Sequence, residues 1–241
     1  MDSYLIPAGE MIYLLKAAGV SLPVAMTAEE FGVPAGTPPQ APAADAEARQ
    51  ELVNALAAPH IVVRVWCMES DSGPGTVWYY WNGYSAVGIS KTESGDFELA
   101  ALDDLDALRM VVKDALTLRP VPEDEDFYAI LSREDFVEAR DLADVWDELP
   151  ALDILEADGL DKSSAKELFD VATAPEWRTQ VNLTGIRPEG NIERIVRVAQ
   201  GAESAWMATP LDPQIKRVRV ETIQPGELES LLWQYWEEVG G

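Results

Sequence analysis

Cysteine and histidine are almost absent from this chain of 241 residues. A single cysteine, Cys67, excludes an internal disulfide, and a single histidine, His60, excludes zinc fingers and sites built from several imidazoles. The two lie on one expected strand, about 20 Å apart at roughly 3.3 Å per residue, which is too far for a thiol–imidazole catalytic pair. We therefore expect no metal centre and no cysteine-based catalysis.

Basic residues are also scarce. Lys and Arg together number 18, Asp and Glu number 43, and the net charge is -25. Such a surface repels phosphate backbones and anionic lipid, so neither nucleic acid nor a membrane surface is expected as a partner. The charge can steer a basic or amphipathic protein partner, although a simple role in solubility explains it equally well.

Long apolar runs and glycine-rich phosphate loops are missing too. The apolar stretch at 5–22 is interrupted by Pro7, Glu10 and Lys16, so we expect neither a signal peptide nor a membrane span, and a cytoplasmic location. No glycine-rich loop follows a strand and opens a helix, which excludes the common nucleotide motifs. Acidic residues are so abundant that no single carboxylate pair stands out. We predict a protein that is not an enzyme and has no cofactor.

A repeated segment is the most informative feature of the sequence. Residues 51–59 read ELVNALAAP and residues 167–175 read ELFDVATAP, an offset of 116 residues. Both segments begin with Glu-Leu and end with Ala-Pro. This similarity predicts two copies of one unit, at about 45–118 and 163–240.

Four strands and a helix are expected after the first segment. The Asn82-Gly83 pair predicts a two-residue hairpin turn, because both central positions of a type I′ turn need positive φ. Asp103 is placed to cap the helix, whose leucines and valine share one face. The expected strands cover 61–67, 76–81, 84–90 and 97–101.

The second copy repeats this order. Pro225 suits the first turn of the last helix. A turn is expected at 209–213, and the strands are expected at 177–184, 191–199, 204–208 and 215–223. The sequence thus predicts an α+β protein with two quasi-symmetric helix–antiparallel sheet–helix halves and a central sheet flanked by helices.

Three segments describe the expected organisation. An N-terminal half at 1–118 contains a helix at 4–18, a Pro- and Ala-rich linker at 34–46 and the first copy. Residues 119–162 form an acidic hinge and connecting helices, one of them capped by Ser132. Residues 163–241 form the second copy, which opens with a capping box of Ser164 and Glu167.

Aromatic side chains are the best candidates for binding. On a strand, Trp78 and Tyr80 point one way and Tyr79 and Trp81 the other. If helices cover one face of the sheet, at least two of these rings are exposed as interface anchors; if helices cover both faces, all are core. Which pair faces outward is left open.

Two further features leave alternatives open. Trp233 and Trp236 on the last helix do not both fit its apolar face, so either the helix is buried nearly all round or one ring reaches a partner. A basic stripe in the second copy can pair with internal acids, remain solvated or receive an acidic partner. Its members are Arg194, Arg197, Lys216, Arg217 and Arg219.

These features resemble the EspG family of type VII secretion chaperones over about 45–118 and 130–240. The resemblance depends on the ELVNALAAP and ELFDVATAP segments, the Asn82-Gly83 hairpin, and the closing helices LDDLDALRMVVKDAL and QPGELESLLWQYWEEV. It implies a cytosolic chaperone that binds the apolar helical tip of a PE–PPE-like heterodimer and keeps it soluble for export. The chain is shorter than typical members, which leaves the substrate class open. The binding residues that the resemblance implies are Trp78, Tyr80, Asn82, Gly83, Tyr84, Trp233 and Trp236.

An acidic immunity or antitoxin-like protein is the alternative function. Acidic charge and surface aromatics would suit the neutralisation of a basic toxin domain equally well. Such an interaction would depend strongly on salt, whereas a chaperone would bind an apolar helical tip. An enzyme of unrecognised type is a third possibility.

Overall fold

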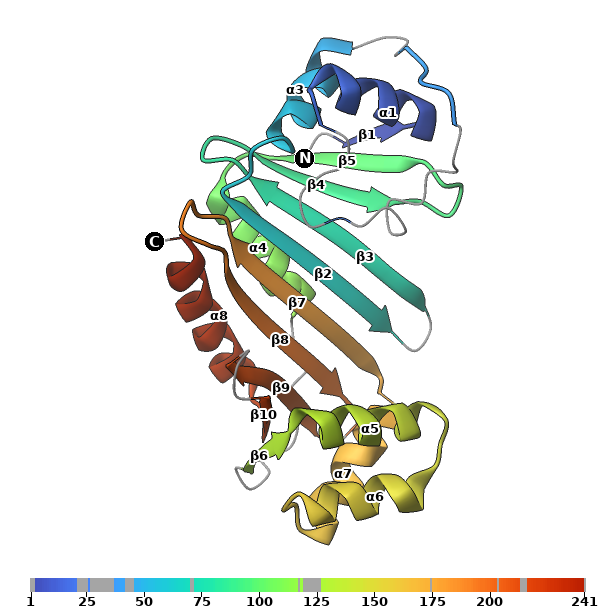
Figure 1. Cartoon of the computed structure of the whole chain (residues 1–241), viewed down its shortest axis with the longest axis vertical. Helices are drawn as coiled ribbons and strands as arrows, with labels where there is room; N and C mark the ends of the chain where they lie inside the picture. The colour runs from blue at the N-terminus through green and yellow to red at the C-terminus, as the bar shows by residue number, and fades with distance from the viewer. Residues whose placement is uncertain are drawn as a thin grey trace.

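The fold was analysed on a computed structural model, which describes residues 3–20, 26, 37–41, 46–69, 72–116, 118, 127–173, 175–202, 204–212 and 216–240. Most of the linker expected at 34–46 and the acidic run at 119–126 lie outside these residues. The described strands form one antiparallel sheet of ten strands, with helices on both of its faces (Figure 1).

The first half of the chain supplies five strands. An edge strand precedes its helices, a meander of four strands follows them, and a closing helix completes the half. The elements are β1 (Ser3–Ile6), α1 (Ala8–Ala17), α3 (Ala46–Ala55), β2 (Ile61–Glu69), β3 (Ser72–Trp81), β4 (Ala86–Lys91), β5 (Phe97–Leu102) and α4 (Leu105–Ala115).

The second half follows the same order of elements. Again an edge strand comes first, then the helices, then the meander and the closing helix. The elements are β6 (Tyr128–Ser132), α5 (Arg133–Asp144), α6 (Glu148–Ala157), α7 (Lys162–Thr173), β7 (Trp177–Gly185), β8 (Ile192–Gln200), β9 (Ala205–Asp212), β10 (Arg217–Thr222) and α8 (Pro225–Gly240).

The two halves meet at the antiparallel pair β2–β7. The strand order is β1-β5-β4-β3-β2-β7-β8-β9-β10-β6, so the two edge strands are the corresponding β1 and β6. The repeat offset of 116 residues maps β2 onto β7, and the central pair of the ladder is Val65 with its own counterpart Val181. A quasi-twofold axis therefore passes through this pair. The prediction of two quasi-symmetric halves in an α+β fold is confirmed.

Three hydrophobic cores hold the helices on the sheet. On one face, α4 and α8 cover the middle strands, where Val63, Val65, Val181 and Leu183 are buried against helix residues such as Trp236. On the opposite face, α1 and α3 cover one end of the sheet and α5, α6 and α7 cover the other. Alternation of side chains along each strand directs one set of residues to each layer.

The aromatic side chains of β3 are part of these cores. Trp78 and Tyr80 are only 4% and 0% exposed and lie beneath α1 and α3, whereas Tyr79 and Trp81 pack on the side of α4 and α8. Burial raises the pKa of Tyr79 to about 12, so its phenol stays neutral. Of the two alternatives that the sequence left open, the second holds: helices cover both faces of this strand, and its rings belong to the cores.

The hairpin between β3 and β4 is present, but its loop is longer than predicted. Trp81 pairs with Ala86, which leaves four residues, 82–85, in the loop instead of two. The side-chain oxygen of Asn82 accepts hydrogen bonds from the N–H groups of Tyr84 (3.0 Å) and Ser85 (2.9 Å). Gly83 has a φ of 96°, so the Asn-Gly pair serves an Asx turn here.

The helix starts differ from prediction at two places. Asp104, not Asp103, accepts the N–H of Ala107, and the helix-opening oxygen at α7 belongs to Asp161, not to Ser164. The prediction of Ser132 as a cap is confirmed, since it accepts the N–H of Asp135 at 3.4 Å. Pro225 is the first residue of α8, also as predicted.

Two strands depart from the sequence-based ranges. β1 occupies the start of the segment that was expected to be all helix, and Pro7 separates it from α1. β9 continues to Asp212 through the turn expected at 209–213. This is possible because the β8–β9 ladder ends at the Arg197–Ala208 pair, so Pro210 lies beyond it and pairs only with Val218 of β10.

Gly185 marks a close approach of β7 to the end of α8. A Cβ atom there would lie 2.4 Å from the carbonyl oxygen of Val239, which is backbone and cannot turn aside. We expect Gly185→Ala to lower the free energy of unfolding by roughly 1–3 kcal/mol, measured by urea denaturation. Gly75→Ala, where nothing lies within 4 Å, is the control and should change stability by less than about 0.5 kcal/mol. Equal effects of the two substitutions would contradict this packing.

None of the helices among the described residues is long and apolar enough to cross a membrane.

Candidate functional site

The helices leave the middle of one sheet face uncovered. Between α1 and α3 at one end and α5, α6 and α7 at the other, no helix of the described chain lies over β2 and β7 (Figure 1). We call this surface the bare face. It is formed by Arg64 and Trp66 of β2, Gln180 and Asn182 of β7, and Ile195 and Arg197 of β8.

Strand register arranges these six residues in two rows. One row is Trp66, Gln180 and Arg197, and the other is Arg64, Asn182 and Ile195. All six side chains are half-buried. Trp66 and Ile195 belong to none of the three cores that the described residues form, so they are apolar side chains that the described fold buries only in part.

A chain of hydrogen bonds crosses the bare face. Arg197 donates through Nε to the side-chain oxygen of Gln180 at 2.7 Å, and Gln180 donates through Nε2 to Asn182 at 2.8 Å. The Arg64 guanidinium lies over the Trp78 ring, 5.9 Å from its centroid. These contacts fix the polar side chains in place, so the surface is organised before any partner arrives.

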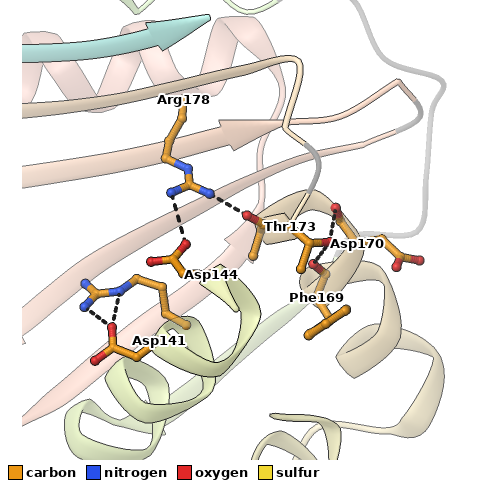
Figure 2. Close-up of polar contacts among 8 residues, drawn as sticks. Asp141, Asp144, Phe169, Asp170, Thr173 and Arg178 are labelled. Atoms are coloured by element: carbon orange, nitrogen blue, oxygen red, sulfur yellow. Dashed lines mark hydrogen bonds and ion pairs between the residues drawn. The ribbon is translucent and has the colours of Figure 1, made fainter. Parts of the chain in front are cut away.

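Helices α5, α6 and α7, which we call the helical wall, bound the bare face on the side of β8 and β9. Figure 2 shows Arg178 of β7 reaching between Asp144 of α5, at 3.8 Å, and the end of α7, where it donates to the carbonyl oxygen of Ala172. Thr173 closes α7 by donating its hydroxyl to the carbonyl oxygen of Phe169 at 2.9 Å. The wall is thereby tied to the sheet at the start of β7.

Arginine side chains lie between the helical wall and the sheet. Three arginines, which we call the arginine cluster, lie there and come from α5, β7 and β8: Arg140, Arg178 and Arg197. Burial, and then the charges of Arg140 and Arg133, lower the pKa of the Arg197 guanidinium. Within the described residues, no carboxylate lies in ion-pair contact with Arg197.

Three of the other four members of the basic stripe form ion pairs within the chain. Arg194 pairs with Glu238 at 2.5 Å, Arg219 with Glu221 at 2.5 Å, and Arg217 with Asp158 at 3.8 Å. For these three, internal pairing is the outcome among the alternatives that the sequence left open.

An apolar cavity of about 110 Å³ lies between the helical wall and the sheet. Its lining comes from α5, α6, α7 and β7 to β10 and includes Phe136, Leu168, Phe169 and Trp206. The charged residues in the lining are Arg140, Arg178 and Arg197, all members of the arginine cluster. Within the part of the chain that the structure describes, no group of three or more His, Cys, Asp or Glu residues could hold a metal ion.

The residues proposed from sequence do not form one site. Trp78, Tyr80 and Trp236 are buried, at 4%, 0% and 1% exposure, so these side chains do not lie on the surface as the expected contacts would. Tyr84 is 90% exposed at the tip of the hairpin loop, and Trp233 is 41% exposed on α8, across the sheet from the bare face.

Sequence reasoning missed the bare face. A signal was present, because polar Gln180 and Asn182 alternate with buried Val181 and Leu183 along β7. Their position beside Trp66, however, follows from the β2–β7 register, which joins residues more than a hundred positions apart.

Comparison with known proteins relates the whole architecture to one solved fold. No family model and no curated protein matches the sequence. Among solved structures, the type VII secretion system chaperone EspG5 of Mycobacterium tuberculosis, determined in complex with the PE25–PPE41 dimer, matches with a TM-score of 0.65 and 11% identity. The match covers 96% of this chain and 94% of that one. At this identity the similarity establishes the fold, and this chain has the fold of the EspG chaperones.

Proposed function

We propose that this chain is a cytosolic chaperone that binds the apolar helical tip of a PE–PPE-like heterodimer and keeps it soluble for export. The observation that carries the proposal is the fold similarity across nearly the full length of a chaperone determined with such a dimer. The excess of acidic residues and the half-buried apolar side chains of the bare face agree with a role in shielding an apolar partner.

The bare face is the proposed docking surface. The large side chain of Trp66 is not part of any hydrophobic core of the described residues. Tryptophan is enriched among the residues that dominate the binding energy of protein interfaces. The helices at either end of the face flank a strip of β2 and β7 along which a helical tip can lie (Figure 1). The amide groups of Gln180 and Asn182 supply polar contacts beside the apolar anchor.

Two of the residues first suggested by the EspG resemblance stay in the proposal as secondary contacts. Tyr84 and Trp233 are exposed and accessible to a partner. Asn82 and Gly83 act through the loop that presents Tyr84. Since Tyr84 and Trp233 lie away from the bare face, only a partner that also reaches around the sheet would contact them.

The test is the affinity of the purified chain for PE–PPE heterodimers of its native host, measured by calorimetry. Replacing Trp66 by alanine should weaken binding roughly 10- to 100-fold, as expected for an aromatic anchor. Trp233→Ala is the comparison variant: because α8 lies on the other face and Trp233 is a secondary contact, we expect a change of less than about threefold.

The outcomes separate the alternatives. If Trp233→Ala weakens binding and Trp66→Ala does not, docking is on the side of α8. If no heterodimer binds and the chain instead retains a basic toxin domain in a salt-sensitive complex, the chaperone proposal is wrong and the immunity function replaces it.

A further inference from the structure

We propose that the arginine cluster receives a carboxylate from the docked partner, so that the segment bound here carries an acidic residue next to an apolar one. This inference rests on the proposed function, because it describes the chemistry of the segment that docks beside the bare face. The occupant is an acidic, apolar segment of a protein partner.

The ion pairs of the arginine cluster are the first observation that supports this inference. In a chain with 18 basic and 43 acidic residues, the charged side chains that line the apolar cavity are three arginines. Arg140 pairs with Asp141 at 2.5 Å, and Arg178 has Asp144 at the longer distance of 3.8 Å. Among the described residues, Arg197 is thus the member of the cluster for which no carboxylate lies in ion-pair contact.

Arg197 is the member of the cluster with which a partner carboxylate would form an ion pair. Its side chain is half-buried, and its hydrogen bond goes to the neutral amide of Gln180. Arg133 and Arg140 add repulsion from the side of α5. Burying a charge is unfavourable unless it is paired, so an incoming carboxylate would offset both desolvation and repulsion.

The cavity explains why the carboxylate should accompany an apolar group. Arg140, Arg178 and Arg197 line the same space of about 110 Å³ as Phe136, Phe169 and Trp206. A carboxylate at Arg197 would therefore place its neighbouring side chain against an apolar lining. A polyanion such as nucleic acid fits less well, because the surface of the chain as a whole repels it.

The first experiment tests the site without any partner. Octanoate, octylammonium and octanol serve as minimal probes that share an apolar chain and differ in charge, with binding followed by the indole N–H signal of Trp206 in NMR titrations. We expect octanoate to bind saturably and most tightly. Arg197→Met should weaken octanoate binding at least roughly tenfold.

A matched variant controls for removal of an arginine from the same strand. Arg194 lies three positions earlier on β8, on the opposite face, where it pairs with Glu238. Arg194→Met should leave octanoate binding within about twofold of the unchanged chain. The inference is overturned if octanoate does not bind, if octylammonium or octanol binds as tightly, or if Arg197→Met retains the affinity while circular dichroism shows an intact fold.

The second experiment uses a PE–PPE heterodimer that the chain binds. Arg197→Glu should weaken the complex at least roughly tenfold, and replacing the acidic residues at the partner's tip by lysine should restore it in the Arg197→Glu variant alone. If Arg197→Glu binds the heterodimer as the unchanged chain does, the inference fails and the proposed function stands. If no heterodimer binds, the proposed function fails, and the octanoate titration decides the inference by itself.

Discussion

Replacing Tyr80 by alanine is expected to lower the free energy of unfolding by about 3–5 kcal/mol, the range for truncating an aromatic side chain in a core. The ring is 0% exposed and packs in the core that joins β3 to α1 and α3, where residues such as Met11, Leu14 and Val53 surround it. Its removal leaves a cavity that the surrounding sheet and helices fill only in part. Urea denaturation followed by circular dichroism measures the loss.

Tyr84 supplies the matched control in the same hairpin. Its ring is 90% exposed, so Tyr84→Ala should change the free energy of unfolding by less than about 0.5 kcal/mol. Similar losses for the two substitutions would show that β3 does not direct Tyr80 beneath the helices. The pair of variants also separates stability from binding, since only Tyr84 is accessible to a partner.

Trp236→Ala is expected to have a loss of the same size, about 3–5 kcal/mol, because its ring is 1% exposed between α8, α4 and the sheet. Trp233 is on the same helix, 41% exposed, with the Arg109 guanidinium 5.5 Å from its ring centroid. Trp233→Ala should cost at most about 1 kcal/mol, the size of an exposed cation–π contact. Thermal and urea denaturation of both variants would test this difference, and equal losses would contradict the burial of Trp236.

The repeat made much of the fold predictable. Two segments with the same ends and the same offset predicted two units, and β-branched runs placed most strands within a few residues of their observed ranges. β1 was missed because the apolar periodicity of α1 continues into Tyr4 and Leu5, and β1 is a strand through its pairing with β5. Pairing of this kind is a long-range interaction that local patterns do not contain.

The candidate site was predicted poorly, for a physical reason. The alternation in β3 correctly divided Trp78 and Tyr80 from Tyr79 and Trp81, but it does not show how many helices cover each face. Exposure at Trp66 depends on where α3 and α5 end, and the cluster around Arg197 depends on how α5 packs on β8. Binding residues chosen for size and hydrophobicity were therefore mostly core residues.

The self-complementary ladder of β2 and β7 has a consequence for how a partner docks. Under the offset of 116 residues, Arg64 corresponds to Gln180 and Trp66 corresponds to Asn182. In the ladder, Arg64 pairs with Asn182 and Trp66 pairs with Gln180. A surface with identical residues at these positions would accept a ligand in two opposite orientations of equal free energy. Here a cation and an indole face two amides, so the degeneracy is lost and the bound segment has a single direction.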